Sequence, residues 1–169
     1  ALSMLADVPQ FDVVKQSLML DDRDRNRTYP TDLYLPANLN TIPPGPIPII
    51  IFSHGYGDTR TNPELVAAAR SLAANGFVAA VPEHIGSNKA YQDALARGLS
   101  RESFDVMEFM NRPLDIHFLI DTLEEKNNTD FQGRLQLDQV GLAGHSFGGY
   151  TALATAGATV DIELLMQQC

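Results

Sequence analysis

The sequence predicts an α/β fold, because short apolar runs typical of buried strands alternate with segments of helical periodicity. Three of these runs are Pro48–Phe52, Phe77–Val81 and Val140–Ala143. Turn residues or charged residues follow each run, which is typical of the loops that leave the ends of strands. We therefore expect one domain over residues 1–169, with a mostly parallel sheet and helices on both of its faces.

The first predicted elements are two strands, Phe11–Leu20 and Thr28–Leu35, joined by a charged turn. Two β-type runs separated by a short polar turn predict an antiparallel hairpin, which we place at the edge of the sheet. An irregular proline-rich loop, residues 37–48, then leads into the first buried strand.

The first predicted helix begins at Pro63, with Asn62 as its N-cap, and ends before Gly76. Proline at the first helical position and glycine just past the last are favourable placements. Two further helices are expected, one over Leu99–Met110 and one that opens at Pro113. On the second of these, apolar residues share one face and acidic residues the other. The apolar residues are Ile116, Leu119, Ile120 and Leu123, and the acidic ones are Asp115, Asp121, Glu124 and Glu125.

The most informative motif is Gly144-His145-Ser146-Phe147-Gly148, a Gly-x-Ser-x-Gly pentapeptide between a buried strand and a helix of small residues. A nucleophilic serine must project from a tight strand-to-helix turn, where only glycine fits two residues before and after it. Ser146 would then lie at the amino end of a helix, where backbone N–H groups stabilise negative charge. The alternative is a structural turn without chemistry.

A second segment, which follows the strand Pro48–Phe52, favours the nucleophile interpretation. Acyl transfer needs two N–H donors for the oxyanion, one from the residue after the nucleophile and one from the loop after an earlier strand. Phe147 and Tyr56 are the candidates for these backbone donors, and glycines flank Tyr56 on both sides. His54 and Gly55 are candidate substrate contacts. An ordinary strand-ending turn is the alternative for this dipeptide.

Three segments together resemble the platelet-activating-factor acetylhydrolase and predicted dienelactone hydrolase branch of the α/β-hydrolase superfamily. They are residues 52–57, residues 72–84 and residues 144–149, and the resemblance extends from about residue 12 to residue 158. It implies an α/β-hydrolase fold, Ser146 as the nucleophile and an oxyanion hole from the Tyr56 and Phe147 amides. His84 is a further candidate substrate contact, with a structural role as the alternative. Because dienelactone hydrolases use a cysteine nucleophile, their lactone substrate is not carried over.

The chain departs from this superfamily in one respect. The usual order is serine, then an acid, then histidine, but none of the four histidines follows Ser146. Asp161 and Glu163 are the only acids after it, and in the family the acid comes after another strand and helix. We expect the 169 residues to be the amino-terminal portion of a longer domain, just past the nucleophile helix. Alone, they would lack the triad acid and histidine and be inactive. The alternative is a non-catalytic α/β-hydrolase relative or fragment that binds a small apolar ligand or a protein partner.

The resemblance implies a serine hydrolase that cleaves a carboxylic ester, as an esterase, lipase or acetylhydrolase, through an acyl-enzyme on Ser146. Its partner would be a small-molecule ester with an apolar acyl or alcohol part, and no cofactor is expected. A net charge of −9 argues against nucleic acid. We expect no membrane span, because no apolar run approaches the roughly 18 residues that a span needs. No dinucleotide or phosphate-loop motif occurs, and the histidine spacing fits no metal site. Oligomeric state and compartment, cytoplasmic or exported after signal removal, stay open.

Overall fold

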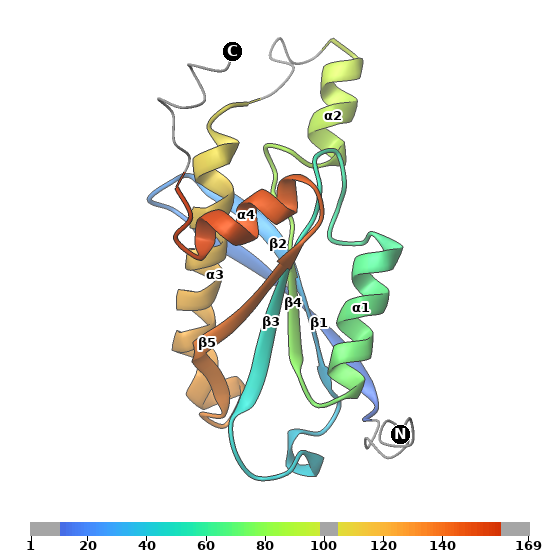
Figure 1. The fold of residues 1–169 in the computed structure, drawn as a ribbon, viewed down its shortest axis with the longest axis vertical. Coiled ribbons are helices and arrows are strands. Elements are labelled where there is room, and N and C mark those ends of the chain that lie inside the picture. The colour runs from blue at the N-terminus through green and yellow to red at the C-terminus, as the bar shows by residue number, and fades with distance from the viewer. Residues whose placement is uncertain (1–10, 99–104, 160–169) are drawn as a thin grey trace.

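A computed structural model describes residues 11–98 and 105–159, in which five strands form one open sheet with the order β1-β2-β4-β3-β5 (Figure 1). Strands β3, β4 and β5 run parallel, whereas β2 is antiparallel to both β1 and β4. The expected edge hairpin and the parallel part of the sheet are thus confirmed. The strands are β1 (Val13–Asp22), β2 (Arg27–Pro36), β3 (Ile47–Ser53), β4 (Val78–Pro82) and β5 (Leu135–Gly144).

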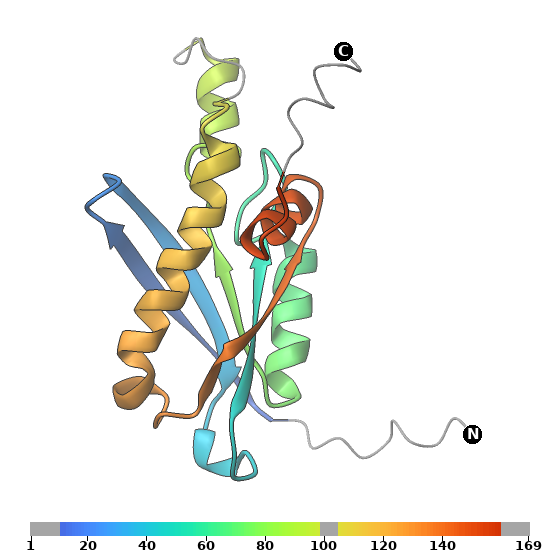
Figure 2. The same cartoon turned by 60° about the vertical axis from the view of Figure 1, so that its left-hand side comes forward.

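Helices α1 and α3 cover opposite faces of this sheet (Figures 1 and 2). Successive side chains of a strand point to opposite faces, and β4 supplies both cores. Ala79 and Val81 belong to the core beneath α1, and Val78 and Ala80 to the core beneath α3. Among the described residues, no helix has both the length and the apolarity to cross a membrane. The helices are η1 (Leu39–Thr41), α1 (Pro63–Ala74), α2 (Lys89–Ala96), α3 (Glu108–Asp130) and α4 (Phe147–Thr155).

Helix α1 has the boundaries that its capping residues predict. The Asn62 side chain accepts hydrogen bonds from the backbone N–H groups of Glu64 and Leu65, at 2.8 and 3.2 Å. Gly76 adopts a φ of +89°, which only glycine reaches without strain. By contrast, α2 was not predicted from the sequence. It begins at Lys89, with Asn88 as its N-cap.

Helix α3 differs from the sequence-based expectation. It begins at Glu108 and contains Pro113 in its interior, so the proline does not open the helix. The expected helix Leu99–Met110 falls partly outside the described residues, and its last residues belong to α3. A proline inside a helix leaves the carbonyl four residues earlier without its usual N–H donor. Here the hydroxyl of Tyr150, in α4, donates to that carbonyl, on Phe109, at 3.0 Å. A long-range contact therefore replaces the bond that Pro113 cannot make.

The topology brings three loops to one edge of the sheet. Because β3, β4 and β5 are parallel, their carboxyl ends meet there. The loop after β3 carries residues 54–58, the loop after β4 carries residues 83–88, and the turn after β5 carries Ser146. Open α/β sheets place their ligands at this edge.

Candidate active site

Ser146 occupies a strained turn between β5 and α4. Its φ of 53° and ψ of −119° are unusual for any residue other than glycine. Serine at the start of a helix normally caps it with its hydroxyl, yet the Ser146 side chain makes no capping hydrogen bond. The residue is exposed at the surface. This is the backbone geometry that a nucleophilic serine needs at a strand-to-helix turn.

The two glycines of the pentapeptide are explained by backbone crowding. A β-carbon on Gly144 would overlap the carbonyl oxygen of Gly148, and one on Gly148 would overlap the carbonyl oxygen of Ser53. Both obstacles are backbone atoms, which cannot move aside as a flexible side chain can. The turn that presents Ser146 therefore packs directly on the end of β3.

The loop after β3 lies beside the serine turn. A β-carbon on Gly55 would lie 3.4 Å from His145 Nδ1 and 3.7 Å from Ser146 Cβ. Tyr56 follows in a turn and not in a strand. The next residue, Gly57, has a φ of +73° and donates its N–H to the Ser87 carbonyl at 2.8 Å. The structure thus brings together the pentapeptide and the second segment that the sequence singled out.

His54 and His84 are both fully buried and bound at both ring nitrogens. His54 Nδ1 donates to the Gly55 carbonyl at 2.8 Å, and its Nε2 accepts the backbone N–H of His84 at 2.9 Å. His84 Nδ1 donates to Asp115 Oδ2 at 3.1 Å, and its Nε2 accepts the Ser53 hydroxyl at 3.0 Å. These partners fix the tautomer of each ring. They favour structural roles for both residues over the substrate contacts considered from the sequence.

Asp115 anchors a group of buried charges that the sequence did not indicate. We call Arg27, Glu108, Arg112 and Asp115 the buried charge cluster. Arg27 forms a two-pronged pair with Asp115, at 3.0 and 2.9 Å, and reaches Glu108 at 2.9 Å. The expectation that Asp115 lies on the polar, exposed face of its helix was wrong, because its side chain has no exposed surface. Arg27, supplied by the hairpin, compensates the charge.

Burial and hydrogen bonding shift the titration of these groups. Burial lowers the pKa of His54, and it lowers the pKa of His84 to about 3. Burial alone would raise the pKa of Asp115, but the hydrogen bonds from His84 and Arg27 outweigh it and lower that pKa. Both imidazoles are therefore neutral at pH 7. Within residues 11–98 and 105–159, no group of His, Cys, Asp and Glu side chains is placed to hold a metal ion.

The family of the chain follows from a comparison with known families. The model of platelet-activating factor acetylhydrolase, isoform II, matches residues 13–105, which is more than half of the chain. The chain belongs to this family. The match includes the loop after β3 and His84, but it ends before Ser146. The assignment of the nucleophile therefore depends on the geometry of the turn.

Individual proteins similar to this chain are consistent with its membership of the acetylhydrolase family. YitV of Bacillus subtilis (strain 168), described as a candidate esterase, is 29% identical over 112 residues, which cover 66% of this chain and 40% of YitV. A ferulic acid esterase from Streptomyces cinnamoneus superposes with a TM-score of 0.63 at 20% identity, over 90% of this chain and 56% of that one. The dienelactone hydrolase from Anabaena variabilis superposes with a TM-score of 0.55 at 19% identity, over 85% of this chain and 57% of that one. The α/β-hydrolase fold is confirmed, and the chain spans about half the length of these proteins.

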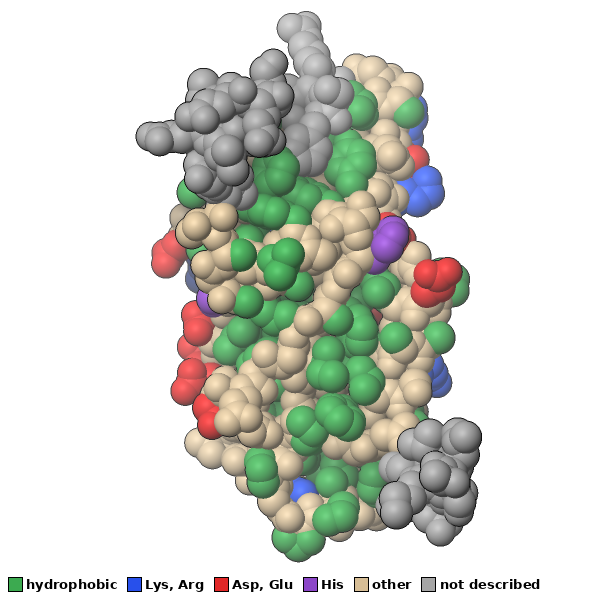
Figure 3. All heavy atoms as spheres, viewed as in Figure 1, with side chains coloured by type: hydrophobic (Ala, Val, Ile, Leu, Met, Phe, Trp, Pro, Cys, Tyr) green, Lys and Arg blue, Asp and Glu red, His purple; other side chains and the backbone are tan. Residues whose placement is uncertain are grey.

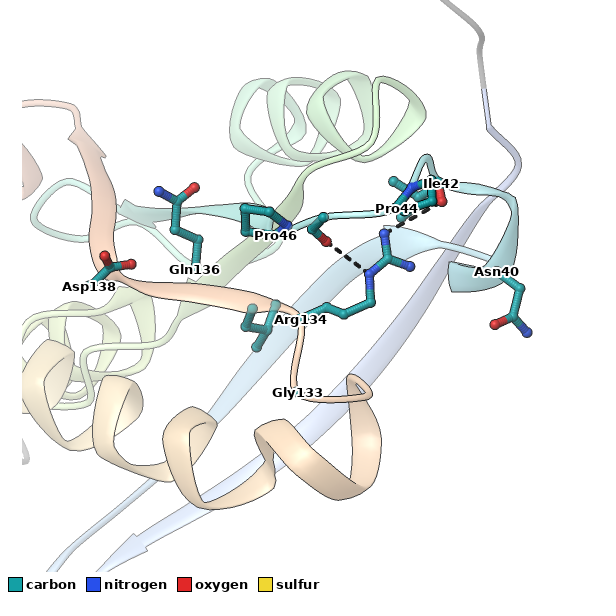
Figure 4. A pocket seen from close by; sticks show the side chains of 10 residues that line it. Asn40, Ile42, Pro44, Pro46, Gly133, Arg134, Gln136 and Asp138 are labelled. Carbon is teal, nitrogen blue, oxygen red and sulfur yellow. Dashed lines mark hydrogen bonds between the residues drawn. The ribbon is translucent and has the colours of Figure 1, made fainter.

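A hollow on the surface lies away from Ser146, at the opposite end of β5. It measures about 720 Å³ and is lined by the loop before β3 and by the start of β5 (Figure 4). Arg134 crosses it and donates to the carbonyls of Gly45, Leu39 and Pro43, at 3.0, 2.8 and 2.7 Å. Each nitrogen of this guanidinium group thus has a carbonyl partner. Such contacts stabilise the irregular loop before β3.

Acidification should destabilise the protein through the two buried histidines. The pKa of His84 is about 3 in the folded state against an ordinary value of 6.5, so the unfolded chain binds more protons between these pH values. The free energy of unfolding should therefore fall as the pH drops below about 6.5, by up to about 1.4 kcal/mol per pH unit for one such group. Above that pH the contribution is fully present. Urea unfolding at pH 5–8 measures the slope, and His84→Gln should make it shallower. An equal slope in the variant would contradict this account of His84.

Proposed function

We propose that the protein is a serine ester hydrolase in which Ser146 is the nucleophile. The observation that carries the proposal is the strained turn that exposes the Ser146 hydroxyl beside the loop after β3. The acetylhydrolase family, the esterase relative and the esterase structures support an ester as the substrate.

The proposed reaction is a two-step acyl transfer. Ser146 Oγ attacks the carbonyl carbon of the ester and gives its proton to a histidine base, and the backbone N–H groups of Tyr56 and Phe147 stabilise the oxyanion. The alcohol leaves with that proton and an acyl-enzyme remains. Water, activated by the same histidine, then releases the acid and restores the serine.

We propose that the histidine base and the acid that orients it lie in other parts of the full-length protein. His54 and His84 cannot accept the Ser146 proton in this structure, because hydrogen bonds occupy both nitrogens of each ring. We propose that residues 1–169 form the amino-terminal portion of a single α/β-hydrolase domain. The partial coverage of the esterase structures supports this division. The 169 residues alone should then show no more than residual esterase activity.

The substrate is proposed to be a small-molecule ester with an apolar acyl or alcohol part. Apolar side chains gather on the face where β5 and α4 lie (Figure 3), and Leu153 of α4 is 65% exposed. Phe109, at the start of α3, packs against Phe147 and Tyr150 of α4. Helix α4, which begins directly after Ser146, therefore carries apolar surface. Such a surface suits a substrate with an apolar group next to the ester.

A panel of p-nitrophenyl esters of increasing acyl length tests the proposal on the full-length protein. We expect turnover on the order of 1–10³ s⁻¹ with at least one ester. A phosphonylating inhibitor of serine hydrolases should abolish it irreversibly. The matching p-nitroanilides serve as the comparison and should react far more slowly. Ester binding without turnover, or activity that survives the inhibitor, would overturn the proposal in favour of a non-catalytic relative or another chemistry.

A further inference from the structure

Arg112 contacts both segments that carry the proposed oxyanion donors. Its Nη2 donates to the His54 carbonyl, two residues before Tyr56, and lies 3.4 Å from Ser53 Oγ. Its guanidinium carbon lies 4.4 Å from the centre of the Phe147 ring. The side chain has no exposed surface. One buried cation thus touches the loop after β3 and the residue that follows the nucleophile.

The contact with the loop fixes the first of two successive peptide planes. Arg112 holds the carbonyl of the His54–Gly55 peptide, and the His54 ring holds the next carbonyl, on Gly55, at 2.8 Å. In a trans peptide the N–H points away from the C=O, and the N–H opposite the Gly55 carbonyl is that of Tyr56. The direction of the Tyr56 N–H therefore depends on Arg112, on the His54 ring and on the N–H of Asp58, which also donates to the Gly55 carbonyl, at 3.3 Å.

The first turns of α3 also hold the nucleophile helix. The ring centres of Phe109 and Phe147 are 5.1 Å apart, and those of Phe109 and Tyr150 are 4.8 Å apart. Tyr150 adds the hydrogen bond to the Phe109 carbonyl that Pro113 leaves without its helical donor. Arg112 therefore extends from a helix that is itself joined to the turn of Ser146.

Stability alone gives a poor account of a buried arginine at this position. Burial lowers the pKa of Arg112 to about 10, and Glu108 and Asp115, one turn before and after it, oppose that shift. The Arg112 guanidinium group therefore stays charged at neutral pH. Its Nε and Nη1 groups have no hydrogen-bond partner among the described residues. Buried charges are costly, and well-packed apolar residues often replace them without loss of stability. Two of the contacts that Arg112 makes, with the His54 carbonyl and with the Phe147 ring, reach the segments that carry the proposed oxyanion donors.

We propose that Arg112 is a positioning residue that holds the backbone N–H groups of Tyr56 and Phe147 in the orientation in which both donate to the oxyanion. This inference rests on the proposed function. It predicts that Arg112→Met in the full-length protein lowers kcat without a matching rise in KM. The loss should approach the scale for removing one oxyanion donor, about 10²-fold. Affinity for a trifluoromethyl ketone, which forms a tetrahedral adduct, should fall with kcat/KM, whereas affinity for a ground-state analogue, the matching alcohol, should not change.

The control is Arg134→Met, the same substitution at another arginine that donates to backbone carbonyls. It should lower thermal stability and leave kcat per active site unchanged. Active sites are counted by fluorophosphonate labelling, so that unfolded protein does not enter kcat. If Arg112→Met does not fold, Arg112→Lys carries the test, because lysine keeps the charge without the fork that reaches two acceptors.

The two proposals fail differently. If Ser146 is labelled and the Arg112 variant keeps the wild-type kcat and ketone affinity, the positioning role is wrong and the proposed function stands. If KM and the affinity for the alcohol change as much as kcat, Arg112 has a general structural role, and the inference is again overturned. If the wild-type protein is not labelled on Ser146, the proposed function itself fails.

Discussion

Replacing Ser146 with alanine should lower kcat for ester hydrolysis by about 10⁶ in the full-length protein, the scale seen when a serine hydrolase loses its nucleophile. The alanine cannot form the acyl-enzyme, and only the oxyanion donors and substrate binding would remain. Steady-state hydrolysis of the best p-nitrophenyl ester measures the loss. KM and thermal stability should change little, because the Ser146 side chain is exposed and does not cap α4.

Ser53 provides a matched control for this substitution. Its hydroxyl donates to His84, whose ring donates to Asp115, so the three residues follow the hydrogen-bonding order of a catalytic triad. Ser53 is only 2% exposed, however, and an ester could not reach it without opening the core. Ser53→Ala should therefore retain turnover. Loss of activity in this variant, with activity kept in Ser146→Ala, would contradict the assignment.

Replacing Gly57 with valine should lower kcat by about 10²–10³, the scale for losing one oxyanion donor. Gly57 has a φ of +73°, which a β-branched residue adopts only with strain. Relief of that strain would turn the backbone next to Tyr56 and break the bond from Gly57 N–H to the Ser87 carbonyl. Tyr56→Phe should cost little through the oxyanion hole, since the donor is a backbone group.

Gly133→Val is the control for backbone strain. Gly133 has a φ of +70°, close to that of Gly57, but it precedes β5, whereas Ser146 follows that strand. Both variants should lose stability, and only the Gly57 variant should lose kcat per labelled active site. Equal kcat in the wild type and the Gly57 variant would show that the loop after β3 does not supply an oxyanion donor.

Local signals in the sequence were sufficient for most of the fold. The strands β3 and β4 lie within one residue of the apolar runs that predicted them, and α1 begins and ends at its caps. These features depend on neighbouring residues, so the chain itself reveals them. The helix α3 was misjudged at Pro113, because the residue that compensates for the proline, Tyr150, belongs to another helix.

The buried charge cluster was missed for a related reason. Along α3 the charged residues Glu108, Arg112 and Asp115 continue, at helical spacing, the buried stripe of Ile116, Leu119 and Leu123. Charged residues are normally assigned to the solvent face, and Arg27, which pairs with Glu108 and Asp115, lies in the hairpin. The helical spacing of the stripe was the signal available in the sequence. The same spacing continues from the apolar residues to the charged ones, which indicates that both lie on the buried face.

The candidate site was predictable where backbone crowding dictates the residue type. Gly144 and Gly148 must be glycine because of the atoms that face them, and the pentapeptide predicted a tight turn between a strand and a helix, where β5 ends and α4 begins. The environment of His54 and His84 was not predictable, because it depends on burial by α3 and on Asp115. The same residue type could have been a substrate contact or a core residue, and only the fold distinguishes these roles.

The most direct measurement is fluorophosphonate labelling of the full-length protein, followed by peptide mapping of the adduct by mass spectrometry. The reagent reacts with a serine only where that serine is activated and accessible. The account predicts a single adduct on Ser146, none in Ser146→Ala, and loss of ester hydrolysis in step with labelling. An adduct on Ser53 or another serine, or ester turnover by a protein that takes up no label, would contradict the claim that Ser146 is the nucleophile.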